Sequence, residues 1–518
     1  MLNKVQTNMT KSYKKRALAP IYVSPNQLVL EGFETPFERK LNKNNRWVVL
    51  AHLIPWDEIC NIYLKQVGVS DTGRPPLNPR IVLGSLIIKH MCNFSDEETV
   101  EHISENVYMQ YFIGYTSFSD KLPFDSSLFV EFRKRLGLEK MNLINEKIVE
   151  IKTRLEKTKD EDKSSNDSEP DPPKKGRVIF DATACPQDIA YPTDLDLLSE
   201  ARKKSEQIID ILYKPLLHDK KPRTYREIAR KEYLQTAQKK NKTRKEIRRA
   251  VKAQLGYLKR NIDSIHQLLD KYESIPLNRR YYKYFLVIQT LFQQQKYMYD
   301  SNTHKVEDRI VSIHQPHIRP IVRGKAQAKT EFGSKIHVSI IDGISFLDEL
   351  SWNTFNEGSH MMDYVEKFRK RFGCYPREVL ADQIYCTREN RAKLKDLGIK
   401  LIAKPLGRPT AVQIHVSPGE RNPIEGKFGQ AKTGYGLNRI KARLKQTSES
   451  WIASIFLVLN LVKLAGVVLH CLLFLYWKGF SVKNVFYSIT QINDNICNQF
   501  YFTRQLSISG KVMMKIDA

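Results

Sequence analysis

Three acidic residues lie where a protein could bind divalent cations. Asp181 follows the apolar run 178–180 and Asp382 follows the apolar run 379–381, so both are expected at the ends of buried strands. Glu425 begins a basic segment with a helical pattern. Two acids at strand ends and a third on a helix can hold two divalent cations against a phosphodiester. The pattern therefore predicts metal-dependent cleavage of DNA.

Each acid also has an ordinary structural explanation. Aspartate commonly begins turns, so Asp181 and Asp382 could simply end their strands. With Asn422 as N-cap and Pro423 at the first helical position, Glu425 would be third, where a glutamate completes a capping box. The two aspartates are far apart in the chain, so a shared chemical role requires that their strands be adjacent.

Other aspartates compete for the same roles. Asp188 and Asp194 lie close to Asp181 in the chain, and Asp342 is a rival of Asp382. Asp342 is already explained by the dipeptide that it forms with Gly343, which is a strong hairpin signal.

The composition favours a polyanionic partner. The 518 residues include 84 Lys and Arg against 57 Asp and Glu, for a formal net charge of +27 and a pI near 9.6. This surplus exceeds what solubility needs, and nucleic acid is the first candidate. The seven scattered cysteines have no C-x-x-C spacing, which argues against disulfides or a zinc cluster and favours a reducing cytoplasm. The N-terminus has no continuous apolar stretch, so no secretory signal is expected.

Half of the surplus charge lies in one stretch. Residues 201–260 contain 20 Lys and Arg against 6 Asp and Glu, a net charge of +14. Such a run is often a solvated helix face. Here Tyr225, Tyr233 and Tyr257 interleave with the charges, so we expect packed helices that present a basic side to a phosphate backbone.

The N-terminal part has a helical pattern. A helix is expected from Asn78 to about Met91, and a second begins at Ser95, where Glu98 three residues later forms a capping box. A third, short helix at 128–136 is closed by Gly137 and carries three basic residues: Arg133, Lys134 and Arg135. Two helices and a basic third helix indicate helix-turn-helix character, although a helical bundle with a solvated basic face fits the same spacing.

Composition suggests the domain boundaries. Residues between 156 and 175 are mostly Asp, Glu, Ser, Pro and Lys, which is typical of a flexible linker. We therefore expect the following division: a basic arm at 1–45, a helical DNA-binding domain at 46–153, a linker at 154–176, a catalytic domain at 177–194 and 310–450, a basic helical insertion at 195–309, and a C-terminal helical segment at 451–518 that packs on the core.

Beyond residue 309 the pattern changes to short strands alternating with helices. The expected elements are strands at 335–341 and 344–350, a helix at 359–371, a strand at 379–382, a helix at 388–397, a strand at 399–403 and the helix with Glu425. With the strand that ends at Asp181, this order predicts an α/β (α+β) ribonuclease-H-like catalytic core. The large basic helical insertion follows its first strand, and an all-α DNA-binding domain precedes it.

One segment imitates a membrane span. Residues 451–477 are largely apolar but are interrupted by Ser454, Asn460, Lys463 and His470. A lysine near the middle of a span costs roughly 2.5–3.5 kcal/mol. A core helix that covers a sheet is the preferred interpretation, and no membrane partner is expected.

Several short motifs are recognisable in their order. They are Leu53-Ile54-Pro55-Trp56, Gly73-Arg74-Pro75-Pro76, Tyr111-Phe112-Ile113-Gly114-Tyr115, Phe132-Arg133-Lys134-Arg135-Leu136-Gly137, Asp181-Ala182-Thr183, Arg323-Gly324-Lys325, Asp382-Gln383-Ile384-Tyr385 and Arg388-Glu389-Asn390-Arg391. In this order the chain resembles, over most of its length, the DDE-type transposases of bacterial insertion sequences, in the grouping usually numbered four and five. In one large branch of this grouping, the third catalytic motif reads Tyr-x2-Arg-x3-Glu-x6-Lys. Its last three places are occupied here by Arg421, Glu425 and Lys432. Pro418 replaces the tyrosine, which indicates a side branch.

The resemblance implies cut-and-paste movement of an element. Asp181, Asp382 and Glu425 would be the catalytic residues and would hold two Mg²⁺ or Mn²⁺ ions. The partners would be double-stranded DNA, as terminal inverted repeats and as target, and a second copy of the chain in a homodimer. The phosphate contacts would come from Arg421 and Lys432, with Arg323, Lys325 and Arg388 as weaker candidates. A catalytically silent DNA-binding derivative and a nuclease without strand transfer are the alternatives.

Overall fold

The structure is a computed structural model, which describes residues 41–67, 76–160, 176–322, 330–403 and 418–477, with side chains described except in 66–67, 151–160, 418 and 467–477. The chain forms two compact units. One comprises residues 1–167 with 456–518, and the other comprises residues 168–455.

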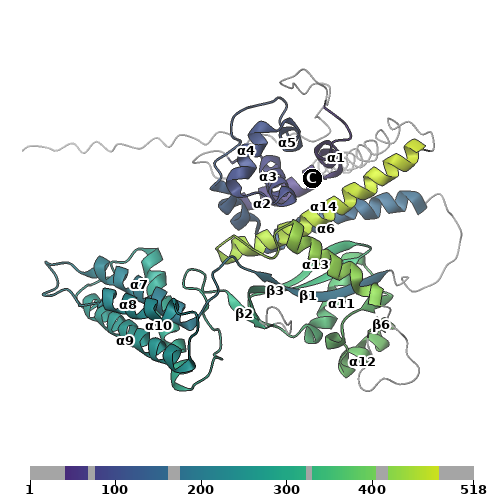
Figure 1. Cartoon of the computed structure of the whole chain (residues 1–518). Helices are drawn as coiled ribbons and strands as arrows, with labels where there is room; N and C mark the ends of the chain where they lie inside the picture. The colour runs from purple at the N-terminus through teal and green to yellow at the C-terminus, as the bar shows by residue number, and fades with distance from the viewer. Residues whose placement is uncertain (1–40, 68–75, 161–175, 323–329, 404–417, 478–518) are drawn as a thin grey trace, which may run out of the picture. The chain divides into compact units, whose positions relative to one another are not determined.

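The N-terminal part of the first unit is helical, as the sequence predicts (Figure 1). Its helices are α1 (Arg46–Leu53), α2 (Trp56–Val67), α3 (Pro79–Cys92), α4 (Asp96–Glu105), α5 (Val107–Phe112) and α6 (Leu128–Asp160). Ser95 caps α4, and both hydrogen bonds of its capping box with Glu98 are present. Trp56, Ile88 and Phe112 are fully buried between these helices.

The short third helix of the prediction is longer in the structure. Gly137 does leave the helical conformation, with φ 62° and ψ −171°. The chain then returns to a helix at once, and α6 continues to Asp160. The predicted linker at 154–176 therefore begins inside a helix, and residues 161–175 lie outside the described residues.

A mixed six-stranded sheet forms the centre of the second unit. Its strands are β1 (Arg177–Pro186), β2 (Arg319–Val322), β3 (Thr330–Ile341), β4 (Ile344–Ser351), β5 (Glu378–Leu380) and β6 (Lys400–Ile402). The order is β2-β3-β1-β5-β6, and β4 also pairs with β3. β3 is antiparallel to β1, β2 and β4, whereas β1, β5 and β6 are parallel. The predicted hairpin between β3 and β4 is present, with positive φ at both Asp342 and Gly343.

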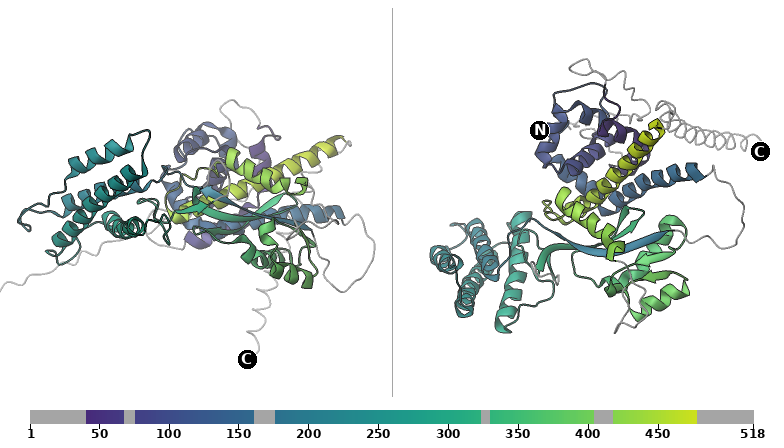
Figure 2. Two further views of the ribbon diagram at one scale, coloured as in Figure 1. Left: turned by 60° about the horizontal axis from the view of Figure 1, so that its bottom comes forward. Right: turned by 45° about the vertical axis from the view of Figure 1, so that its right-hand side comes forward.

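Helices cover both faces of this sheet (Figures 1 and 2). On one face Phe180 and His337 pack against Tyr364 of α11 (Met361–Phe372), and α12 (Arg388–Asp396) lies on the same side. The other face meets α13 (Asn422–Gly434). Alternate residues of a strand point to opposite faces, so Asp181, next to Phe180, faces α13.

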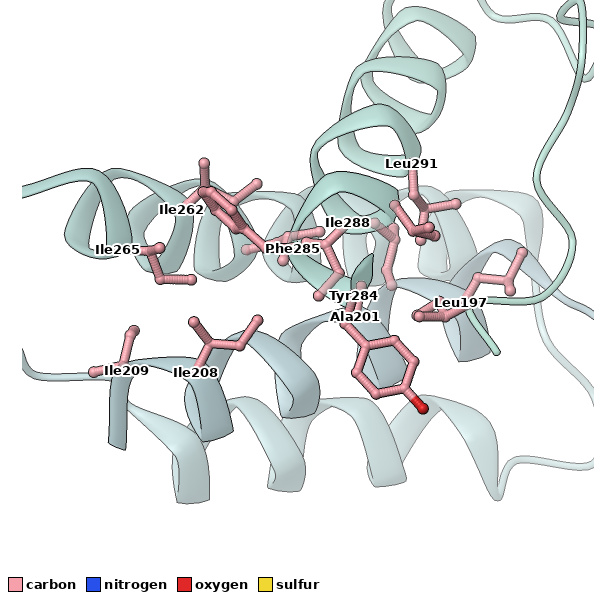
Figure 3. Close-up of a cluster of buried hydrophobic side chains, with 14 of the residues drawn as sticks. Leu197, Ala201, Ile208, Ile209, Ile262, Ile265, Tyr284, Phe285, Ile288 and Leu291 are labelled. Carbon is pink, nitrogen blue, oxygen red and sulfur yellow. The ribbon is translucent and has the colours of Figure 1, made fainter. Parts of the chain in front are cut away.

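Four helices occupy the chain between β1 and β2. They are α7 (Asp194–Leu212), α8 (Arg226–Ala237), α9 (Arg244–Leu269) and α10 (Arg279–Asp300). Figure 3 shows the cluster that joins α7, α9 and α10, with Ile208, Ile265 and Ile288 completely buried. This stretch, which we call the helical block, thus has a hydrophobic core of its own.

The apolar C-terminal stretch belongs to one long helix, α14 (Lys445–Trp477). Residues 445–466 are long and apolar enough to cross a membrane by composition, but 72% of the most apolar window is buried within the structure. In the first unit Asn460 of α14 donates a hydrogen bond of 2.9 Å to Asn145 of α6. A buried polar contact of this kind is typical of a core helix. The predicted C-terminal segment is 451–518, and its part 478–518 lies outside the described residues.

Candidate active site

Adjacent strands bring Asp181 and Asp382 together. Ile179 of β1 pairs with Leu380 at the end of β5 in parallel register, so the residues two positions further along each strand are neighbours. Asp181 is the half-buried member, with 19% of its side chain exposed, and Asp382 is 51% exposed. The adjacency that a shared role requires is therefore present. The prediction that Asp181 ends its strand is wrong, because β1 stays paired with β3 as far as Pro186.

The Arg421 guanidinium lies between the two carboxylates. Its Nη2 is 3.2 Å from Oδ2 of Asp181, and its Nη1 is 3.2 Å from Oδ1 of Asp382. Arg421 is the residue directly before α13, whose N-terminus lies against β1. One guanidinium is thus shared by an acid within β1 and an acid that follows β5.

Burial acts strongly on Asp181. Loss of solvent raises the pKa of its carboxyl to about 6, although the hydrogen bond from the Ala182 amide and the charge of Arg421 oppose this rise. The negative charges of Glu357 and Asp382 add to it. A carboxylate with crowded negative neighbours favours a bound cation, because the cation stabilises the ionised form.

Glu425 lies in the first turn of α13 and is exposed. The predicted capping box is wrong: Arg421 occupies the N-cap position, it makes no side-chain capping bond, and Asn422 is already helical. Glu425 follows Arg421 by four residues, so both side chains lie on the same side of the helix. Capping therefore does not explain Glu425. It lies one helical turn from Arg421, whose guanidinium bridges Asp181 and Asp382.

The three predicted acids do not converge on one point in this conformation. Among the described residues, no group of three His, Cys, Asp or Glu side chains lies close enough to hold a metal ion. The donors present nevertheless fit such an ion, because Asp181 and Asp382 offer hard oxygen ligands and already share a positive group. Arg421 occupies the space between them.

Glu357 is an acidic neighbour that the sequence patterns do not reveal. It begins the short helix η3 (Glu357–His360), which packs on η4 (Gln383–Tyr385) directly after Asp382. Its carboxylate pairs with Lys335 at 2.7 Å, and both side chains are mostly buried. Asn390 holds the two short helices together, since its amide donates to the carbonyls of Gly358 at 2.6 Å and Tyr385 at 2.9 Å.

The competing aspartates have structural partners. Asp188 pairs with Arg439 at 2.8 Å, and Asp194 pairs with Arg309 at 2.8 Å in the first turn of α7. Asp342 lies in the β3–β4 turn. These contacts account for the three residues without any catalytic role.

The predicted phosphate-binding residues have different positions. Lys432 is in the last turn of α13, two turns beyond Glu425, and Arg388 is the exposed first residue of α12. Arg323 and Lys325 lie outside the described residues. A side chain at Gly426, Gly429 or Gly434 of α13 would meet no atom within 4 Å, so these glycines do not serve close packing against the described residues.

The three basic residues of α6 differ in exposure. Arg133 is turned inward, where it makes two hydrogen bonds to Asp96 at 2.9 and 2.7 Å and only 4% of its side chain is exposed. The prediction that it binds DNA is therefore replaced by a structural role at the start of α4. Lys134 and Arg135 remain exposed.

The comparisons with known proteins concern both units. Residues 35–135 match the family model described as "Transposase domain (DUF772)", and residues 379–462 match the one described as "Transposase DDE domain". A protein of Rhizobium meliloti, "Uncharacterized protein ORF8 in nfe locus", is 31% identical over 172 residues, which cover 33% of this chain and 75% of that protein. No solved structure matches the chain significantly.

These matches define an enzyme class whose members act on DNA. The chain belongs to the DDE-type transposases of insertion sequences. The DDE domain implies a ribonuclease-H-like fold, which agrees with the mixed sheet, and transposases of this family normally use divalent metal ions.

Proposed function

We propose that this protein is a transposase that binds the terminal inverted repeats of an insertion sequence, hydrolyses phosphodiesters at the element ends and joins the 3′-hydroxyl ends to target DNA. The observation that carries the proposal is the sharing of the Arg421 guanidinium by Asp181 and Asp382, which come from adjacent strands. Two acids that share a cation beside a helix with a third acid provide the donors that phosphodiester cleavage needs.

Each side chain has a defined task in this proposal. Asp181, Asp382 and Glu425 would hold two Mg²⁺ or Mn²⁺ ions. Bound there, the ions would acidify a water molecule and neutralise the leaving oxygen. Arg421 and Lys432 would hold phosphates of the scissile strand. Weaker candidates for the same contacts are Arg323, Lys325 and Arg388.

Arg421 would change partners when DNA binds. In the present conformation it neutralises the two aspartates, and a guanidinium is equally suited to a phosphate. Once cations occupy the carboxylates, Arg421 would be repelled from them and would turn to the nearby phosphate.

The other parts of the chain would serve recognition. The helical domain at 46–153 would bind the element ends, with Lys134 and Arg135 facing the DNA. Residues 177–194 and 310–450 would form the catalytic domain, and 195–309 an insertion within it. Two ends must be held together before joining, so we expect a homodimer that acts in the cytoplasm.

Supplying precut element ends together with a target plasmid tests this function. A transposase joins the 3′-hydroxyl ends to the plasmid, and the joined product disappears with Asp382→Ala. A nuclease without strand transfer would cut DNA but give no joined product. A catalytically silent derivative would bind the ends and yield neither reaction.

A further inference from the structure

The helical block carries an exposed basic ridge on α9. The apolar side of this helix packs into the core of the block through Val251, Leu255, Leu258, Ile262 and Ile265. On nearly the opposite side, four exposed cations recur at helical spacing: Lys245, Arg249, Lys252 and Lys259. We call these four residues the α9 ridge.

The cations of the ridge form no salt bridge with the described residues, whereas several other cations of the block are paired. Lys239 pairs with Glu246, and Lys296 pairs with Asp300. Like charges three or four residues apart destabilise a helix. The ridge therefore lowers the stability of α9 unless an anion binds to it.

Gly256 lies on the ridge between Lys252 and Lys259. It is exposed in the middle of a long helix, and a side chain there would meet no atom of the described chain within 4 Å. Glycine destabilises a helix interior relative to alanine, and packing within the block does not require it. A notch between two cations allows the backbone of a partner to approach closely.

The dimensions and chemistry of the ridge fit duplex DNA. Fourteen residue steps of α9 correspond to roughly 21 Å, which is about six phosphate spacings along one strand. A single nucleotide would occupy only a fraction of this length. A membrane surface fits poorly, because the ridge lacks the large apolar residues that membrane-bound helices insert.

We propose that the α9 ridge is a second DNA-binding surface, which holds the phosphate backbone of the element-end duplex through Lys245, Arg249, Lys252 and Lys259. The surface belongs to a block with its own core (Figure 3), so it is distinct from both the predicted N-terminal DNA-binding domain and the acidic residues of the candidate site. The role of the duplex as an element end rests on the proposed function, but the affinity for duplex DNA does not.

The test compares two full-length variants that lose the same charge. The ridge variant is K245Q/R249Q/K252Q/K259Q, and the control K221Q/K239Q/K271Q/K296Q removes four cations that are paired with acids. Binding to an element-end duplex and to a random duplex is measured at several KCl concentrations. Each lost phosphate contact reduces the magnitude of the slope of log K against log salt by about 0.9. In the ridge variant the magnitude of this slope should therefore fall by roughly 3 to 4. In the control variant the magnitude of the slope should fall by less than about 1.

A single substitution provides a second, independent test of the ridge. Gly256→Glu improves helix propensity but places a negative charge among the cations, so it should weaken DNA binding at least tenfold without a lower melting temperature. Equal slopes for the ridge variant and the control would overturn the proposal. The slope could fall in the ridge variant while the wild-type protein neither cleaves nor joins element ends. That result would support DNA binding by the ridge and contradict the proposed function.

Discussion

Arg421 and Asp181 are joined by a contact of 3.2 Å between a guanidinium nitrogen and a carboxylate oxygen, although 240 residues separate them in the chain. The same guanidinium contacts Asp382 at 3.2 Å. In this conformation the positive charge at the site comes from the protein. Cations that bind there must compete with an arginine.

Replacement of Arg421 by glutamine should therefore separate cation binding from cleavage. Without the competing charge, Mn²⁺ affinity should rise about tenfold or more, because an opposite charge at this distance stabilises a carboxylate by at least one pKa unit. End cleavage should fall at the same time, since a phosphate contact is lost. Mn²⁺ titration by calorimetry gives the affinity. Arg439→Gln, which frees the single carboxylate of Asp188, is the matched control and should leave Mn²⁺ affinity unchanged. Unchanged or weaker Mn²⁺ binding by Arg421→Gln would contradict the competition.

Cation binding should depend on pH through Asp181. Burial raises the pKa of this carboxyl from 3.8 to about 6, so below about pH 6 a cation must displace a proton. Mn²⁺ affinity should rise from pH 5 to pH 7 and then level off. In the absence of cations the folded protein binds a proton between about pH 4 and 6 that the unfolded chain has released, so its free energy of unfolding should fall as the pH rises through this window. Asp181→Asn should weaken both effects, whereas the exposed Asp188→Asn should leave them unchanged.

The ion pair between Lys335 and Glu357 should contribute to stability. Only 17% and 14% of these side chains are exposed, so Glu357→Gln leaves a mostly buried lysine without a counter-charge. We expect a loss of about 1–3 kcal/mol in urea unfolding. The pair of Lys393 and Glu389 is 52% and 73% exposed, and Glu389→Gln should have little effect on the free energy of unfolding. Equal losses in the two variants would show that burial of the first pair has no consequence.

Gly358 should be essential to the position of Asp382. A β-carbon at this glycine would lie 2.3 Å from the carbonyl oxygen of Ile384, in the short helix that Asp382 caps. Gly358→Ala should therefore destabilise the protein by about 2 kcal/mol or more and reduce end cleavage. Gly429→Ala is the control, because a β-carbon there meets no described atom within 4 Å. It should be neutral or stabilising by up to about 1 kcal/mol. Full cleavage by Gly358→Ala would show that the contact between the two short helices can relax.

The adjacency of Asp181 and Asp382 could be predicted because each follows an apolar run and a shared role requires neighbouring strands. The continuation of β1 beyond Asp181 to Pro186 could not, since it depends on pairing with β3. The bridge through Arg421 could not, since it depends on how α13 docks on the sheet. Glu357 escaped notice because no strand or motif marks it. The inward position of Arg133 was also missed, because residue spacing alone does not tell which side of α6 faces Asp96.

The central claim is that Asp181, Asp382 and Glu425 act together on the phosphodiester at the element end. Its most direct test measures end cleavage and end binding by Asp181→Ala, Asp382→Ala and Glu425→Ala with the same labelled duplex. Each variant should bind the duplex as the wild-type protein does and leave it uncut in Mg²⁺ or Mn²⁺. Robust cleavage by any one of the three variants would contradict it.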